Sequence, residues 1–230
     1  MNYTLIILGI ILVVILYVLY TVISEKGVSV TKKLYLKEAN SSIAMKDLSN
    51  PVSVRYSYNL WVYVNALTNG APINNIFSIK SATATPQSFF ELNLTSDAKL
   101  KYKITTVASG GESMVDNEAM SNFPLQKWVY ISISVDTNIV DIYIDGKLIR
   151  SQKVDRIQPP TKECSVMYPS NFDAYIAKFD RFDKPVDPET VWNAYMAGNG
   201  GSYFTSLFSS YGANLTLTKD SLDLRKFTMF

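Results

Sequence analysis

The strongest constraint on the fold is a regular alternation of side chains over residues 128–154. From 129 to 135 every odd-numbered residue is Val or Ile, and the residues between them are Tyr or Ser. The same period of two returns at positions 140, 142 and 144, after a polar turn. Asp145-Gly146 then favours a tight hairpin turn, because both central positions of such a turn need a positive φ. Side chains on a strand point alternately to opposite faces, so the pattern predicts a three-strand antiparallel meander.

Alternation of the same kind occurs over most of the chain. The run from Val52 to Val64 predicts a long, half-buried strand. Further strands are expected at Asn75–Lys80, Phe89–Thr95, Lys99–Thr106 and Ala174–Phe182. Residues 110–122 are polar and contain two glycines, so they are expected to form a loop. The sequence therefore predicts an all-β fold, a jelly-roll sandwich of two antiparallel sheets.

One short helix is expected near the C-terminus. Asp187 is a good N-cap, Pro188 suits the first helical position, and Gly198 ends the pattern. Apolar residues between them recur at helical spacing, which predicts one buried face. We expect Trp192, on this face, to pack against the sandwich.

The first 24 residues carry no charged side chain. Nineteen apolar residues in a helix span about 28 Å, close to the hydrocarbon thickness of a bilayer. Residues 1–24 therefore predict a transmembrane helix. The alternative is a cleaved signal peptide, but the segment lacks the basic start and the small residues that a cleavage site needs. The residues expected in contact with lipid are Leu5, Ile6, Ile7, Leu8, Ile10, Ile11, Leu12, Val13, Val14, Ile15, Leu16 and Tyr17.

Charges around this segment predict its orientation. Basic residues follow it within a short distance, at Lys26, Lys32, Lys33 and Lys37. The positive-inside rule then places the C-terminal domain of a single-pass protein on the cytosolic side. The single cysteine, Cys164, agrees with a reducing compartment. Four glycosylation triplets leave a lumenal position open as the alternative, at Asn2, Asn40, Asn93 and Asn214.

Four segments follow from these patterns: the helix at 1–24, a stalk at 25–32, the sandwich at 33–198 and an aromatic tail at 199–230. In the tail, large apolar residues recur at i, i+3, i+4 and i+7, as on one face of a short helix, and residues 214–218 resemble a strand. We expect the tail to dock on a protein partner or, alternatively, to complete the sandwich as an edge strand. The expected docking residues are Phe204, Leu207, Phe208, Tyr211 and Phe230.

The meander also resembles a known family. The run from Trp128 through Asp136 to residues 141–147 is similar to the hairpin of the concanavalin A-like lectin/glucanase sandwiches, the laminin-G and pentraxin-like group. Two further segments resemble their early core strand and their closing strand with its helix, at residues 57–64 and 175–199. The resemblance covers residues 52–198 and implies a concanavalin A-like jelly roll. Its motifs are structural and not catalytic, so they indicate the fold more strongly than the function.

Catalytic residues are scarce. The chain has no histidine, which removes the usual general base and most zinc sites, and Cys164 alone cannot form a metal cluster. The paired-carboxylate strand of the glucanases is also missing. Calcium ligands are conceivable at Asp116, Asn117 and Glu118, although acidic loop residues are usually only solvated. The net charge of +2 gives no support to nucleic-acid binding. We expect a protein that is not an enzyme and needs no cofactor.

Two functions fit these expectations. The first is a structural protein that joins a lipid bilayer to a protein shell, because a membrane anchor with such a domain resembles minor capsid or inner-membrane virion proteins of nucleocytoplasmic large DNA viruses. The alternative is a lectin-like module that binds carbohydrate or peptide. For a sugar site, Trp61 and Tyr63 are the candidate aromatic residues, since both fall on the polar face of their strand.

Overall fold

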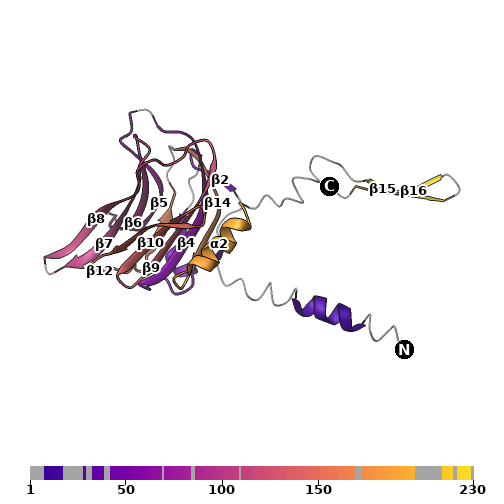
Figure 1. Ribbon diagram of the computed structural model, residues 1–230, viewed down its shortest axis with the longest axis horizontal. Coiled ribbons are helices and arrows are strands. Elements are labelled where there is room, and N and C mark those ends of the chain that lie inside the picture. The colour runs from indigo at the N-terminus through magenta and orange to yellow at the C-terminus, as the bar shows by residue number, and fades with distance from the viewer. Residues whose placement is uncertain are drawn as a thin grey trace.

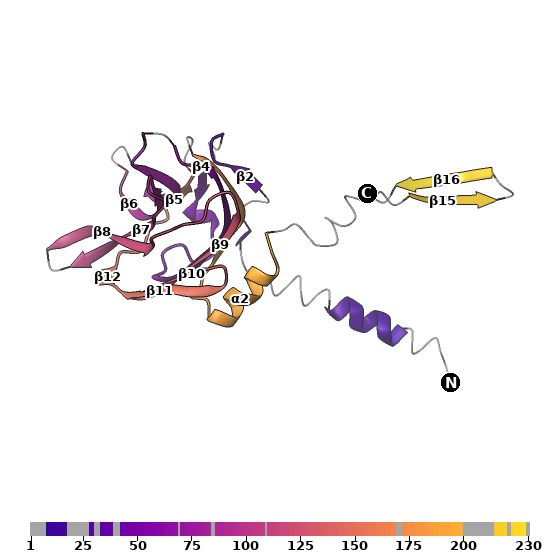
Figure 2. The ribbon, with the colours of Figure 1, turned by 45° about the horizontal axis from the view of Figure 1, so that its top comes forward.

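The computed structural model is a β-sandwich of two seven-stranded antiparallel sheets packed face to face (Figure 1, Figure 2). This confirms the predicted fold class. The structure describes residues 8–17, 28–29, 33–38, 42–68, 70–83, 86–108, 110–168, 172–199, 214–219 and 222–228.

The first sheet contains the predicted meander. Its order is β1–β14–β4–β9–β10–β11, and β2 also pairs with β14. Asp145 and Gly146 both have positive φ, 48° and 79°, as the hairpin turn between β10 and β11 requires. The strands are β1 (Val28–Ser29), β2 (Lys33–Tyr35), β4 (Arg55–Ala66), β9 (Trp128–Asp136), β10 (Ile139–Ile144), β11 (Lys147–Lys153) and β14 (Asp173–Phe182).

The second sheet has the order β12–β7–β6–β5–β13–β3, and β8 also pairs with β7. A 3-10 turn, η1 (Met45–Asp47), follows β3. The strands are β3 (Ser42–Ala44), β5 (Ile73–Ser81), β6 (Ser88–Thr95), β7 (Leu100–Ala108), β8 (Gly111–Met120), β12 (Arg156–Ile157) and β13 (Cys164–Met167).

The loop predicted at residues 110–122 is wrong, because this segment forms β8. Among the described strands β8 pairs only with β7, and most of its side chains are exposed. An edge strand of this kind buries too few side chains to show an apolar alternation, and charged residues protect it from pairing with other chains. Polar composition therefore concealed a regular strand.

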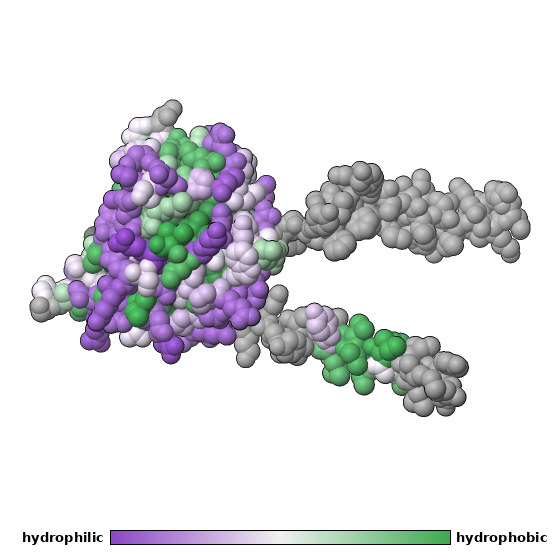
Figure 3. Space-filling view, viewed as in Figure 1, coloured by the Kyte–Doolittle hydropathy of each residue, from purple (hydrophilic) through white to green (hydrophobic). Residues whose placement is uncertain are grey.

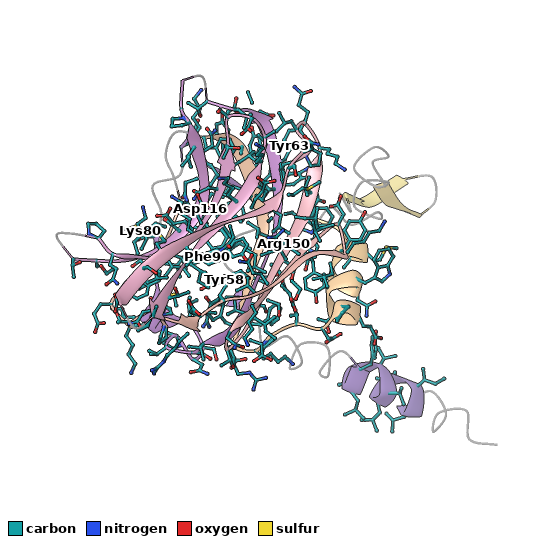
Figure 4. The ribbon with its side chains drawn as sticks, turned by 60° about the vertical axis from the view of Figure 1, so that its left-hand side comes forward. Tyr58, Tyr63, Lys80, Phe90, Asp116 and Arg150 are labelled. Carbon is teal, nitrogen blue, oxygen red and sulfur yellow. The ribbon has the colours of Figure 1, made fainter. Side chains whose placement is uncertain are left out.

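The core lies between the sheets and is rich in aromatic rings. Tyr58 from β4, Phe77 from β5, Phe90 from β6 and Phe179 from β14 are fully buried. The Phe77 ring centroid lies 5.1 Å from that of Phe179 and 5.4 Å from that of Tyr58. In Figure 4, Tyr58 and Phe90 are labelled in this interior. Cys164 is also buried, as expected for a small apolar residue.

Helix α2 (Pro188–Met196) confirms the predicted helix and covers part of the outer face of the first sheet. The Asp187 carboxylate accepts hydrogen bonds from the Thr190 hydroxyl (2.7 Å) and backbone N–H (2.9 Å), which lower the pKa of Asp187. Val191 is the buried anchor of the helix. Trp192 remains 43% exposed. It packs on the sandwich as expected, but its contact is with Gly146 in the turn between β10 and β11.

Replacing Gly146 with alanine should destabilise the protein by about 2–3 kcal/mol. Two effects contribute: a side chain is strained at a positive φ, and the new Cβ atom would overlap with α2. A Cβ atom here would lie 2.7 Å from Trp192 Cε3 and 3.2 Å from Tyr195 Cδ1, so α2 would have to shift. Gly70 is the matched control, because its φ of 77° is similar but a Cβ would meet no atom within 4 Å. Urea unfolding of G146A and G70A separates the two contributions; equal losses would show that contact with α2 contributes nothing.

The N-terminal helix described by the structure covers residues 8–17, and its large apolar side chains are exposed (Figure 3). Ten helical residues rise about 15 Å, half of the roughly 30 Å hydrocarbon core of a bilayer. In the part of the chain that the structure describes, we find no helix with the length and apolar character needed to cross a membrane. The predicted localisation, a single-pass membrane protein with a cytosolic C-terminal domain, is therefore wrong. Leu5, Ile6 and Ile7 lie outside the described residues.

The C-terminal tail contains a two-stranded sheet of its own, formed by β15 (Asn214–Lys219) and β16 (Leu222–Thr228). The strand expected at residues 214–218 is thus confirmed. The expected docking residues fall outside the described residues, and their role stays a prediction: Phe204, Leu207, Phe208, Tyr211 and Phe230.

Candidate functional site

The outer face of the second sheet is polar. Cross-strand pairing brings outward side chains of β5, β6 and β7 into rows, because residues in register lie side by side on one face. One row runs from Asn75 through Asn93 to Lys101, and the next includes Ser78 and Glu91. In Figure 4, Lys80 lies on this side of the molecule and Tyr63 lies on the opposite side. This face of the sheet therefore carries amide, hydroxyl and charged side chains, of which Ser78 and Asn93 are buried among their neighbours.

Part of this face is hollowed into a groove of about 350 Å³. Polar side chains from β5 and β6 line it, together with a few apolar and aromatic side chains. We call it the sheet groove; its lining residues are Ile73, Asn75, Ser78, Lys80, Glu91, Asn93, Met167 and Tyr168. The volume lies at the lower end of the range typical of small-ligand sites.

The Glu91 carboxylate, which lines the sheet groove, is held in place by its neighbours. The Ser88 hydroxyl donates to its Oε1 at 2.7 Å, and the Lys80 Nζ lies 3.6 Å from the same oxygen. The Asn93 amide donates to Oε2 at 3.4 Å. Because these partners fix the carboxylate, it does not have to be ordered when a ligand arrives.

The two asparagine side chains form a second fixed pair in the groove. The Asn75 Nδ2 donates to the Asn93 Oδ1 at 2.8 Å and to the Leu92 carbonyl at 3.4 Å. Asn93 is only 2% exposed, so the glycosylation triplet at this position is buried in the fold. The amide pair therefore supports the Glu91 carboxylate and the Lys80 ammonium, which can hydrogen-bond neighbouring hydroxyl groups of one ligand.

The structure separates the two aromatic residues proposed from the sequence for sugar contacts. Trp61 is 7% exposed and lies under α2, where Tyr195 stacks on it at 5.7 Å. Trp61 is therefore part of the helix–sheet packing and is closed to a ligand. Tyr63 is partly exposed, but on the outer face of the first sheet and away from the sheet groove.

The proposed calcium ligands do not converge, because β8 alternates their directions. Asp116 forms an ion pair with Lys101 at 3.6 Å, and the Asn117 Oδ1 accepts a hydrogen bond from Gln152 at 2.6 Å. Across the described ranges, no three histidine, cysteine or acidic side chains are grouped as a metal site would require.

The groove residues were not singled out from the sequence. The alternation in β5 and β6 indicated which side chains point outward, but not that a hollow lies above them. That hollow depends on β13, a strand far away in the sequence, whose Met167 pairs with Ser78 and lines the groove. The sequence did contain one indication of the site. Amide and charged residues cluster on two consecutive strands, at Asn75, Lys80, Glu91 and Asn93.

Comparison with known proteins agrees with this architecture. A search of curated proteins gave no match. Among solved structures, the botulinum neurotoxin serotype D ligand-binding domain in complex with N-acetylneuraminic acid is similar, with a TM-score of 0.54, 18% identity and coverage of 74% of this chain and 43% of that one. The receptor-binding domain of botulinum neurotoxin D has a TM-score of 0.53, 16% identity and coverage of 74% and 45%. This chain thus spans less than half the length of those domains, and the likeness shows a shared fold.

A family model gives the assignment. The model described as the concanavalin A-like lectin/glucanases superfamily matches residues 37–192, which contain nearly all strands of both large sheets and most of α2. The matched range also includes the meander and every residue of the sheet groove. The chain belongs to the concanavalin A-like lectin/glucanases superfamily.

Proposed function

We propose that this protein is a carbohydrate-binding module that holds a glycan in the sheet groove without cleaving it. The observation that carries the proposal is the fixed Glu91 carboxylate, with Lys80 and the Asn75–Asn93 amide pair around it. Neighbouring hydroxyls on a sugar ring each donate and accept, so a cluster of fixed acceptors and donors is complementary to them. The lectin-like family and a structural neighbour crystallised with N-acetylneuraminic acid support the proposal.

The lining of the groove supports binding without cleavage. Glycoside hydrolysis usually needs two carboxyl groups, about 5–10 Å apart. Among the described residues that line the groove, Glu91 is the one acidic side chain. Its two oxygens accept hydrogen bonds from the Ser88 hydroxyl and the Asn93 amide, which hold the carboxylate in one orientation.

The predicted role as a structural protein between a lipid bilayer and a capsid depended on the membrane anchor. With that localisation contradicted, the lipid and capsid partners predicted from it lack support. Carbohydrate is the partner class that the groove supports.

The substitution Glu91→Gln should weaken glycan binding by about 10- to 100-fold, since hydrogen bonds to a charged group contribute roughly 1.5–3 kcal/mol. The full chain is first screened on an array of neutral and acidic oligosaccharides that includes N-acetylneuraminic acid, and the tightest ligand is measured by isothermal titration calorimetry. Asp116→Asn is the control, because Asp116 lies on the same sheet outside the groove lining.

Thermal unfolding of both variants confirms that each one is folded at the titration temperature. If no oligosaccharide on the array is bound, the carbohydrate proposal is wrong. If Glu91→Gln and Asp116→Asn bind the ligand equally well, the sheet groove is not the site.

A further inference from the structure

A second surface lies on the outer face of the first sheet, beside α2. Cross-strand pairing aligns three aromatic residues in one row, Trp128 from β9, Tyr63 from β4 and Tyr175 from β14. The next row along the sheet, with Trp61 and Tyr130, is buried under the helix. The row at Tyr63 is partly exposed. We call Tyr63, Trp128 and Tyr175 the aromatic slot.

The rings of the aromatic slot are steeply inclined to one another. The Tyr63 ring makes an angle of 57° with Trp128 at a centroid distance of 5.5 Å. With Tyr175 the angle is 63° and the distance 6.5 Å. Tyr63 stands between the other two in the register of the sheet, so the three rings are neighbours with faces turned in different directions.

A cation already occupies this slot. The Lys33 Nζ lies 4.7 Å from the Tyr175 ring centroid and 5.9 Å from that of Trp128. Ring faces carry partial negative charge and attract cations at such distances. Lys33 forms no ion pair with any described residue, and its ammonium lies against the rings of Tyr175 and Trp128. The position of this ammonium shows that the slot suits a positive charge.

A fixed carboxylate strengthens the negative potential at one end of the slot. The Asp173 Oδ1 accepts hydrogen bonds from the Tyr35 hydroxyl at 3.1 Å and from the Asn65 Nδ2 at 2.9 Å. Tyr35 in turn stacks on Tyr175 at 4.6 Å. Burial and the neighbouring Asp173 raise the pKa of Tyr35, so this hydroxyl stays neutral and keeps donating to the carboxylate.

Lys33 is weakly held in the slot. It is exposed and belongs to β2, a three-residue strand at the edge of the sheet. Contact between an ammonium and a ring at an exposed site contributes little, because the ammonium exchanges strong hydration for it. A cation that is less strongly hydrated than the lysine ammonium can therefore compete for the same rings.

We propose that the aromatic slot binds the quaternary ammonium group of a choline-type ligand, in competition with Lys33. A trimethylammonium group has no N–H donors to lose and presents a large, weakly hydrated surface to the rings. This site lies on the opposite face of the sandwich from the sheet groove, and it is independent of the proposed glycan binding. Both ligands can be bound at once.

Choline chloride is the probe, added to the full chain and followed by NMR. The trimethyl resonance should move upfield in a saturable manner, because ring currents shield protons above aromatic faces. Its uncharged isostere, 3,3-dimethylbutan-1-ol, should bind at least fivefold more weakly, which is the contribution expected of a cation–π contact. Equal affinity for the two probes would overturn the proposal, since shape and apolarity alone would then explain binding.

Removing the resident lysine gives the sharper test. Lys33→Ala should tighten choline binding by about two- to fivefold, because the slot is no longer occupied in the free protein. Lys37→Ala removes the same charge from an exposed position nearby and is the matched control. The proposal fails if Lys33→Ala tightens binding no more than Lys37→Ala does, because general electrostatics would then account for the change.

Two further variants locate the site. Tyr175→Leu should abolish the choline shift, whereas Glu91→Gln should leave it unchanged. Loss of the shift in Glu91→Gln would place choline in the sheet groove and contradict the proposal. Lys33→Ala changes only an exposed side chain, so the test stands even if Tyr175→Leu fails to fold. Binding to glycerophosphocholine in solution or to phosphatidylcholine vesicles distinguishes a soluble ligand from a lipid head group, and either source supports the slot.

Discussion

Replacing Phe77 with alanine is expected to lower the free energy of unfolding by about 3–5 kcal/mol, the loss usual for a buried aromatic residue. Phe77 has no exposed surface, and its ring lies within 5.6 Å of three others, those of Tyr58, Phe90 and Phe179. These rings come from both sheets, so the cavity left by alanine would lie at the centre of the sheet-to-sheet contact. The surrounding strands are fixed by ladder hydrogen bonds and cannot collapse into the space.

Urea denaturation of the full chain measures this loss. Phe77→Leu should cost much less, about 1–2 kcal/mol, because it keeps most of the buried volume. Ile73→Ala, at an exposed position of the same strand, should change stability by less than about 1 kcal/mol. A loss below about 1.5 kcal/mol for Phe77→Ala would show that the two sheets are less tightly packed than the ring distances indicate.

Replacing Arg181 with alanine should destabilise the protein by about 2–4 kcal/mol, because it removes a buried charged group together with its hydrogen bonds. Arg181 is only 2% exposed. Its guanidinium donates to the backbone carbonyls of Ser49 and Asn50, and it lies 5.8 Å from the ring centroid of Tyr56. The arginine therefore fastens the turn before β4 to β14, and alanine would leave two carbonyl groups without their donors.

Arg55→Ala is the comparison for this variant. Arg55 is also on the first sheet, but its ion pair with Asp136 is largely exposed and should contribute less than about 1 kcal/mol. Arg181→Lys should recover only part of the stability, since one ammonium cannot reproduce two diverging N–H groups. Equal melting temperatures for Arg55→Ala and Arg181→Ala would refute the fastening role.

Local patterns in the sequence predicted local structure well. The meander was predicted because its strands are consecutive, one face is apolar, and Asp145-Gly146 suits the turn conformation that the structure shows. Helix α2 was predicted because its capping residue and its apolar stripe are adjacent in the sequence. Strand β8 was missed because an exposed edge strand carries no apolar signal.

The ligand surfaces could not be predicted in the same way. Trp61 and Tyr63 are two residues apart on one face of one strand, and the sequence gives them equal status. Only the position of α2 distinguishes them, because the helix covers Trp61 and leaves Tyr63 partly exposed. The sheet groove likewise depends on pairing between distant strands, and bulges within β5 and β6 shift the register of that pairing. The alternation of side chains within one strand encodes neither the position of α2 over Trp61 nor the pairing of distant strands at the groove.

The pairing of β4 has a consequence for synthesis on the ribosome. β4 is a central strand, but its two neighbours are β9 and β14, both made much later, with Tyr58 paired to Ile133 on one side and to Arg181 on the other. At roughly 5–20 residues per second, translation from β4 to β14 takes on the order of ten seconds. An apolar strand thus has two open edges until β9 is made, and one open edge until β14 is made. The nascent chain is therefore most prone to aggregate between the synthesis of β4 and that of β14, the last strand of the sandwich.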